Sequence, residues 1–145
     1  MKKKNFLVCG ANGYIGTALI KVLQKNSDNR VIALTHKTLP GANFEEIICL
    51  QKSLTQLSKE DFEQFPPQQI YHLARFGAPL PFLRNYSATK GAKANARLID
   101  ILKSLYKTPD INYARGSLMY GATEKTTTVD SILNPMGFGK DYIKV

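Results

Sequence analysis

The sequence has little cysteine, no tryptophan and no long apolar run. Two cysteines among 145 residues exclude the disulfide framework of small secreted domains. No apolar run approaches the roughly 20 residues of a bilayer-spanning helix, and the run behind the basic segment 1–4 is too short for a signal peptide. The length suffices for one domain with a real core, so we expect a single cytoplasmic domain with no membrane as partner.

Acidic residues are scarce as well, with 11 against 20 lysines and arginines and a formal net charge of +9. Such an excess can indicate nucleic-acid binding, but beyond Lys2–Lys4 the lysines are scattered and form no basic tract. We interpret the charge as a solvated surface that helps to attract a phosphate-bearing ligand, and we expect no nucleic acid as partner.

The two cysteines fall in different predicted strands. Cys9 ends the first strand and Cys49 lies in the third, with a second strand expected between them, which puts the two about 9–10 Å apart. A disulfide cannot bridge that distance. Both are therefore predicted to be reduced, buried thiols. Neither has a metal-ligand partner at useful spacing, so no metal site is expected.

A glycine-rich stretch separates the apolar run 6–8 from a segment with helical periodicity. It consists of Gly10, Ala11, Asn12, Gly13, Tyr14, Ile15 and Gly16. In such a strand–turn–helix element, the first glycine permits a tight turn, the second a close approach to a pyrophosphate, and the third close packing of helix on strand. An anion would lie at the helix N-terminus. The alternative is an ordinary strand-to-helix turn that binds nothing.

Apolar periodicity predicts the elements around this loop. Residues recurring at i, i+3, i+4, i+7 and i+8 predict one apolar helix face, formed by Ile15, Ala18, Leu19, Val22 and Leu23. Short apolar runs predict strands at 31–34, 46–50, 70–73 and 111–114. Because 39–44 carries a Pro-Gly pair and no helical pattern, we expect a loop in place of a helix before the third strand.

Further helices are predicted in the second half. A capping box from Ser58 to Asp61 predicts a helix through Phe65 that Pro66-Pro67 ends. A final helix is expected from about residue 137. The longest helix is predicted from 86 to 106, with one face formed by Ala92, Ala96, Ile99, Leu102 and Tyr106.

The segment Thr35-His36-Lys37 lies where a dinucleotide-binding domain selects its cofactor. An acidic residue about 20 positions past the glycines would bind the ribose 2′-hydroxyl, whereas a basic one suits a 2′-phosphate. No Asp or Glu occurs between Asn29 and Asn43. We therefore predict that His36 and Lys37 contact the cofactor, which is NAD or NADP, with NADP slightly favoured. The alternative is a solvent-facing lysine and a site that accepts either.

The end of the fourth predicted strand supplies further candidates. Leu73, Ala74 and Arg75 come at its carboxyl end, where a cofactor would lie. The basic side chain of Arg75 can reach a diphosphate. His72 is predicted to face the core rather than to act as a catalyst.

Three segments in this order resemble one family. The stretch 10–16 resembles the nucleotide loop of the extended short-chain dehydrogenases/reductases, the group of nucleotide-sugar epimerases and dehydratases. Residues 71–74 (YHLA) resemble its fourth-strand motif, and 117–121 (SLMYG) its fifth-strand ending. The resemblance implies an α/β fold, a Rossmann-like doubly wound parallel sheet of strand order 3-2-1-4-5, which binds NAD(P) for oxidoreduction at a nucleotide-sugar carbon. It also implies a homodimer through the 86–106 helix. Where the family has an Asp-Leu that touches adenine, this chain has Ser53-Leu54.

The family's catalytic pair does not match cleanly. Members use a Tyr-x-x-x-Lys pair on the last helix, assisted by a Ser or Thr after the fifth strand, with the tyrosine as base. In the alignment on 134–135, the tyrosine position is Phe138 and the lysine position is Tyr142, which leaves no base. A slipped register uses Tyr142 with Ser117, but its lysine would then fall one residue past Val145. Ser117 and Tyr142 are the catalytic candidates, and the alternative is that Ser117 only satisfies the loop backbone.

The resemblance covers only the N-terminal portion of the family's fold. Relatives continue through a sixth and seventh strand and a small domain that binds the sugar. Residues 1–145 are thus expected to be an NAD(P)-binding Rossmann domain truncated before the sixth strand and the substrate domain, inactive as the isolated chain. The alternative is a catalytically silent dinucleotide-binding or regulatory module that acts with a partner protein.

Overall fold

The computed structural model describes residues 3–37, 39, 47–74, 84–105 and 110–113. The chain divides into two compact units. The first, Met1–Arg75 with Arg97–Ala114, contains all the described strands. The second comprises Phe76–Ala96 and Arg115–Val145, of which residues 84–96 of a helix are described. The segment 40–44 of the predicted loop and the helix predicted from about residue 137 lie outside the described residues.

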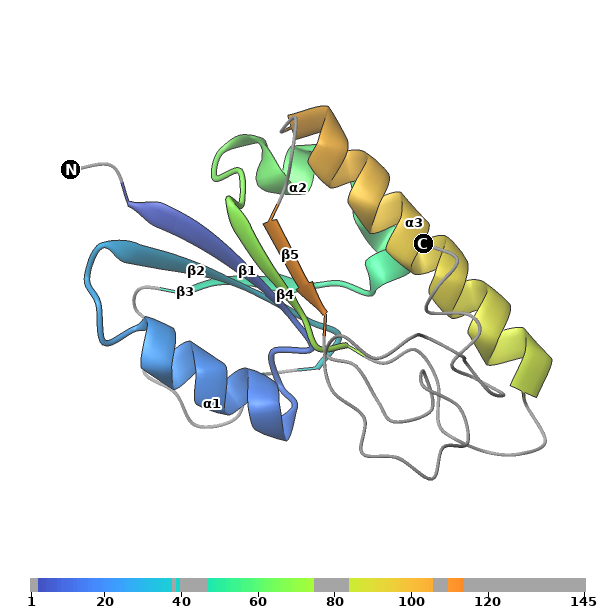
Figure 1. Cartoon of the computed structure of the whole chain (residues 1–145), viewed down its shortest axis with the longest axis horizontal. Coiled ribbons are helices and arrows are strands. Elements are labelled where there is room, and N and C mark those ends of the chain that lie inside the picture. Colours follow the sequence, from blue (N-terminus) through green and yellow to red (C-terminus); the bar gives the residue numbers. More distant parts are fainter. Residues whose placement is uncertain (1–2, 38, 40–46, 75–83, 106–109, 114–145) are drawn as a thin grey trace, which may run out of the picture. The chain divides into compact units, whose positions relative to one another are not determined.

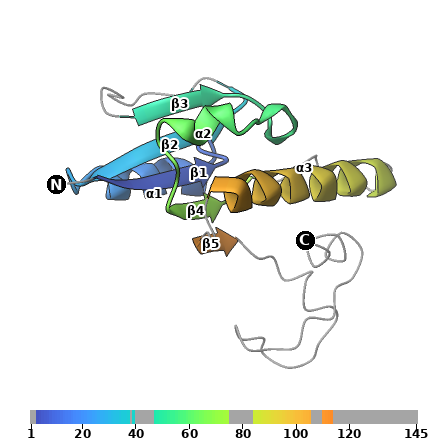
Figure 2. The same cartoon turned by 90° about the horizontal axis from the view of Figure 1, so that it is seen from above.

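The first unit is built on one parallel sheet. Its strands follow one another in the order β3-β2-β1-β4-β5 (Figure 2), and every neighbouring pair is parallel. This confirms the predicted doubly wound fold and its strand order. The bounds are β1 Lys4–Cys9, β2 Asn29–Thr35, β3 Ile47–Gln51, β4 Gln69–His72 and β5 Asp110–Tyr113.

Helices cover both faces of this sheet. Helix α1 (Tyr14–Leu23) joins β1 to β2, while α2 (Glu60–Glu63) and α3 (Arg84–Leu105) lie in the connections that run in the opposite direction across the sheet. Because parallel crossovers are right-handed, opposite directions place the helices on opposite faces. Figure 1 shows α1 on one face, with α2 and residues 97–105 of α3 on the other. None of the described helices is long and apolar enough to cross a bilayer.

The central strands are apolar because both of their faces are covered. Successive strand residues point to opposite faces. On the α1 side the buried cluster comprises Phe6, Val8, Ala11, Ile20, Leu23, Val31, Ala33 and Leu39. The alternating strand residues Leu7, Ile32 and Ile70 point to the other face and are fully buried, as are the helix-side residues Leu57, Phe62, Leu98 and Leu102.

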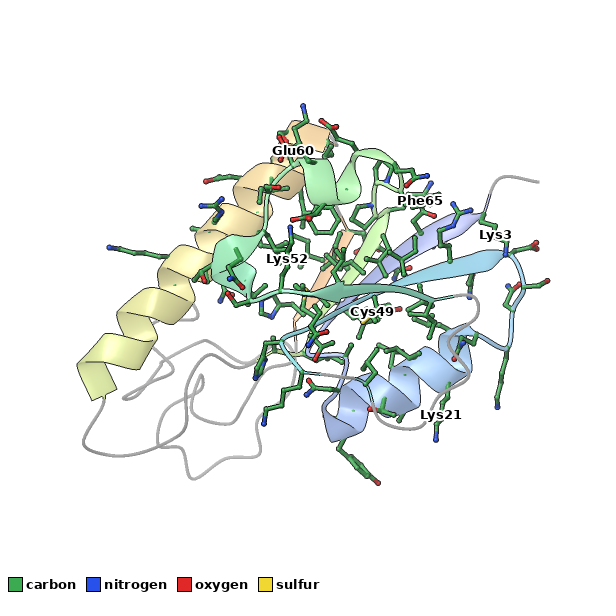
Figure 3. The ribbon with its side chains drawn as sticks, turned by 180° about the vertical axis from the view of Figure 1, so that it is seen from behind. Lys3, Lys21, Cys49, Lys52, Glu60 and Phe65 are labelled. Carbon is green, nitrogen blue, oxygen red and sulfur yellow. The ribbon has the colours of Figure 1, made fainter. Side chains whose placement is uncertain are left out.

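The buried face of α1 differs from the prediction. Of the five predicted residues, Ile15 and Val22 are 61% and 59% exposed, and Ala18 is exposed as well. Figure 3 shows Lys21 extending from the outer side of the same helix. Two overlapping rows of apolar side chains run along α1. Because the first turn of α1 lies in close contact with the end of β1, the row that packs on the sheet is not the predicted one. The residues that this row buries are Gly16, Ile20 and Leu23.

The other helices also depart from their predicted limits. Helix α2 ends at Glu63, short of Phe65, because the residue before a proline disfavours helical backbone. The carboxylate of Asp61 accepts the Ser58 N–H at 2.9 Å, but the complete capping box lies at the 3-10 helix η1 (Leu54–Gln56). In α3, Ala96 is exposed although Leu102 is buried as predicted, since alanines spread around the helix make its periodicity ambiguous. Within residues 91–105 of α3, the buried residues are Ala94, Asn95, Leu98 and Leu102.

The two thiols lie in different environments. Cys9 is buried, and burial raises the pKa of its thiol to about 12. Cys49 is exposed on β3, so the prediction of a buried thiol is wrong for this residue (Figure 3). The reason is that β3 is an edge strand, while α1 packs on β1 and β2. Cys49 is in register with Ala33 and shares its face, whereas Cys9 points to the opposite face. No disulfide can join them.

The orientation of α1 gives a first test. Ile20→Ala should lower the free energy of unfolding by about 2–5 kcal/mol, because Ile20 is 3% exposed and its truncation leaves a cavity. Val22→Ala, on the exposed side of the same helix, should change it by less than about 0.5 kcal/mol. Urea denaturation followed by circular dichroism measures both. Equal losses, or a larger loss for Val22→Ala, would contradict this orientation.

Candidate functional site

The carboxyl ends of three strands meet at the glycine loop. The N–H groups of Gly10 and Ala11 donate to the carbonyl of Leu34 at 3.1 and 3.2 Å, which ties the loop to the end of β2. On the other side, the N–H of Leu73 donates to the carbonyl of Cys9 at 3.0 Å, which ties it to the end of β4. The structure thus brings together the predicted candidates at 10–16, 36–37 and 73–74.

This meeting point is the switch point of the sheet. From β1 the chain turns to β2 on one side and later returns to β4 on the other. Ligands of open parallel sheets bind outside the carboxyl ends of the strands at such a point. At the opposite ends of β1 and β4, Asn5 forms two hydrogen bonds to the segment before β4. Its N–H donates to Gln68 Oε1 and its Nδ2 donates to the Pro66 carbonyl, both at 2.9 Å. These bonds hold the two strands beside each other.

Two glycines of the loop are required by its backbone. Gly10 has φ +80°, and a Cβ there would lie 2.9 Å from the amide nitrogen of Ala74. A Cβ on Gly16 would lie 2.3 Å from the carbonyl oxygen of Gly10 and 3.0 Å from the Cα of Ala11. No side chain fits at these distances. The roles predicted for Gly10 in the turn and Gly16 in packing are therefore confirmed.

Gly13 differs, because its backbone conformation does not require a glycine. It caps α1 with φ −76°, which any residue can adopt. Among the described residues other than its chain neighbours, a Cβ there would meet only the Gly10 carbonyl oxygen within 4 Å, at 3.2 Å. Gly13 is exposed. A side chain would occupy the space directly in front of the helix N-terminus.

The N-terminus of α1 presents donors to that space. The first helical hydrogen bond joins the N–H of Thr17 to the carbonyl of Gly13 at 2.9 Å. The N–H groups of Tyr14, Ile15 and Gly16 precede it and have no acceptor within the helix. The first turn carries no acidic residue, so nothing there opposes an anion. These features fit the pyrophosphate of a dinucleotide.

The remaining residues around the loop differ in exposure. Tyr14 is 95% exposed, while Asn12 is half-buried. Ala11 is fully buried in the α1-side core, and its N–H is used by Leu34, so its part in the site is structural. Ala74 is half-buried against Gly10.

The end of β2 forms a closed turn that was not predicted from the sequence. Thr35 is 3% exposed, and its hydroxyl donates to the Lys37 carbonyl at 2.9 Å and accepts the Lys37 N–H at 3.1 Å. His36 and Lys37 are exposed. A hydroxyl residue two positions before an exposed lysine is a signal for such a turn.

The end of β3 is occupied by structural contacts. Ser53 caps η1, with its N–H donating to Gln56 Oε1 at 3.0 Å, and Leu54 is buried. Lys52 pairs with Asp61 at 2.5 Å (Figure 3 labels Lys52). Burial by itself raises the pKa of the Asp61 carboxyl, but the hydrogen bonds from Lys52 and Ser58 outweigh it and hold the pKa below its usual range. The ammonium group of Lys52 therefore has a structural partner in Asp61.

Three predicted residues lie outside the described part of the chain: Arg75, Ser117 and Tyr142. Their roles stay predictions. His72 is 3% exposed, as expected of a core-facing strand residue. Among the described residues, no cluster of His, Cys, Asp or Glu could hold a metal ion.

The glycine contacts give a second test. Gly16→Ala should lower the free energy of unfolding by about 1–3 kcal/mol or more, because the new methyl group would push α1 off the end of β1. Gly13→Ala is the matched control and should cost about 1 kcal/mol at most, the difference between Gly and Ala as helix caps. Thermal and urea unfolding measure both. A costlier Gly13→Ala would show that the loop is packed differently.

Several solved structures share this fold, and they include two epimerases whose names give a nucleotide sugar. MoeE5 in complex with UDP-glucose and NAD superposes with a TM-score of 0.78 and 21% identity over 97% of this chain and 46% of its own. UDP-glucuronic acid 4-epimerase from Bacillus cereus with NAD gives 0.75 and 19%, over 97% and 49%. ADP-L-glycero-D-manno-heptose-6-epimerase from Helicobacter pylori gives 0.74 and 19%, over 99% and 49%. The chain thus spans just under half the length of these structures.

At these identities the structures establish the fold alone, and no curated protein sequence matches the chain. A family model supplies the stronger evidence. The NAD dependent epimerase/dehydratase family matches residues 6–142, which run from the first strand through the glycine loop and on beyond β5. Because this match covers nearly the whole chain, the protein belongs to the NAD dependent epimerase/dehydratase family.

Proposed function

We propose that this chain is the NAD(P)-binding domain of an oxidoreductase of the epimerase/dehydratase type that acts on nucleotide sugars. The observation that carries the proposal is the N-terminus of α1, which lies at the switch point and is capped by the exposed Gly13. Structures of the same fold that were solved with NAD and UDP-sugars support the choice of ligand.

The residues for binding are those gathered around the loop. The N–H groups at the start of α1 would hold the pyrophosphate, with Asn12 and Gly13 beside it. His36 and Lys37, at the end of β2, would contact the adenosine ribose, and Leu73 and Ala74 would line the side formed by β4. When bound, the dinucleotide accepts and returns a hydride, and the chain's part is to orient it.

The choice between NAD and NADP rests on the end of β2. Thr35, at about the distance from the glycines where NAD-specific domains have an acid, is a buried neutral residue whose hydroxyl is already hydrogen-bonded. Lys37 is exposed, and among the described residues it has no carboxylate within ion-pair distance. A 2′-phosphate would meet a positive charge there. We infer that NADP binds at least as tightly as NAD.

The proposal for the isolated chain ends at binding. The candidates for catalysis are Ser117 and Tyr142, while Phe138 stands at the base position in the other register. Loss of a general base costs typically 10²–10⁴-fold in rate, and loss of the groups that orient the sugar costs more. We therefore expect no turnover of nucleotide sugars by residues 1–145 alone. A homodimer through the 86–106 helix, and action with a partner protein, stay predictions.

Dinucleotide binding is tested by filling the space at Gly13. Gly13→Val should weaken NAD and NADP by at least about tenfold, or about 1.4 kcal/mol, because its side chain occupies the place of the pyrophosphate. Isothermal titration calorimetry measures the affinity, and circular dichroism checks the fold. Ala18→Val is the control, since it adds bulk on the exposed side of the same helix. Unchanged affinity in a folded Gly13→Val variant would rule out the loop as the site.

The cofactor preference is tested by reversing the charge at Lys37. Lys37→Asp should make NAD bind more tightly than NADP, because a carboxylate repels a 2′-phosphate and accepts hydrogen bonds from ribose hydroxyls. Lys21→Asp makes the same charge change on the outer side of α1 and should preserve the wild-type order. A wild-type preference for NAD of about tenfold or more, equivalent to about 1.4 kcal/mol, would refute the inference.

A further inference from the structure

The hydroxyl of Thr35 is bonded on both sides to one residue. It donates to the Lys37 carbonyl at 2.9 Å and accepts the Lys37 N–H at 3.1 Å. Thr35 is itself held in the sheet, where it pairs with Gln51 of β3, and it is 3% exposed. The backbone of Lys37 is thus fastened to a buried residue of the sheet by two hydrogen bonds.

This arrangement leaves Thr35 no hydroxyl proton to donate to a ligand. Its buried side chain has its donor and an acceptor position committed to Lys37. A carboxylate at the same position could accept the Lys37 N–H but could not donate to the carbonyl. Recognition of a ligand at the end of β2 is therefore left to the exposed side chains of His36 and Lys37. Of these two residues, Lys37 is held through its backbone.

We propose that Thr35 is a positioning residue for cofactor selection, which holds Lys37 where its ammonium group meets the 2′-phosphate of NADP. The inference rests on the proposed dinucleotide site and adds how this site discriminates between cofactors. The Leu34 carbonyl, one residue before Thr35, accepts the N–H groups of Gly10 and Ala11, so the turn starts from a point fixed relative to the glycine loop. A lysine on a free backbone would lose more entropy on reaching the phosphate.

The test is a double-mutant cycle read as the ratio of NADP to NAD affinity, measured by calorimetry on the 145-residue chain. Thr35→Val keeps the β-branched shape but removes both hydrogen bonds, and it should lower the ratio by about fivefold. Thr35→Ser keeps the hydroxyl and should stay within about twofold of wild type. In a Lys37→Ala background, Thr35→Val should change the ratio by less than about twofold, because Thr35 acts through Lys37.

The outcomes separate this inference from the proposed function. If wild type binds neither dinucleotide, the site and the inference both fail. If wild type binds NADP and Thr35→Val leaves the ratio unchanged, or lowers it equally in the Lys37→Ala background, the inference alone fails.

A ligand-free measurement on wild type keeps the test valid should Thr35→Val not fold. The Lys37 amide should exchange its hydrogen at least about tenfold more slowly than in an unstructured peptide, because it donates to Thr35. Exchange at the unstructured rate would show that the turn is open in solution and would overturn the inference.

Discussion

The contact between Gly16 and the carbonyl of Gly10 is the constraint on which the site depends. A Cβ at Gly16 would lie 2.3 Å from that oxygen, so α1 begins directly against the end of β1. This contact sets the rotation of the helix and turns Ile20 and Leu23 into the core. It also directs the N–H groups of the first helical turn toward the carboxyl edge of the sheet. A larger residue at position 16 would therefore displace the N–H groups of the first helical turn and also change the packing of the core.

Gly10 links this helix to the strands on either side. With φ +80° it turns the chain while its N–H binds the Leu34 carbonyl and its Cα faces the Ala74 backbone. The ends of β2 and β4 are thereby held to one loop, and the cofactor contacts proposed on each side share its position. The first turn of α1 lacks acids and Lys37 adds a positive charge, so the electrostatics around the loop favour a phosphate ligand.

Much of the site could be predicted from sequence because its requirements are local. The spacing of Gly10, Gly13 and Gly16 between a strand and a helix predicts a phosphate loop, and the contacts of Gly10 and Gly16 confirm two of the three glycine roles. Lys37 was predicted to contact the cofactor from the lack of acids around it, whereas the hydrogen bonds that Thr35 makes to its backbone were not predicted. A hydroxyl group that forms hydrogen bonds with the backbone two residues further on is only weakly indicated by the sequence.

The strands and the position of the loop could be predicted from the sequence, because apolar runs and glycine spacing are local signals, and the family resemblance implied the strand order that the sheet has. Which apolar residues are covered depends instead on how neighbouring elements pack in three dimensions. Val22 and Cys49 are as apolar as their buried neighbours, yet Val22 lies on the outer side of α1 and Cys49 on an edge strand. The apolar periodicity of the sequence indicates which side chains can be buried. Burial itself requires a neighbouring element, and the close contact at Gly16 determines which row of α1 meets one.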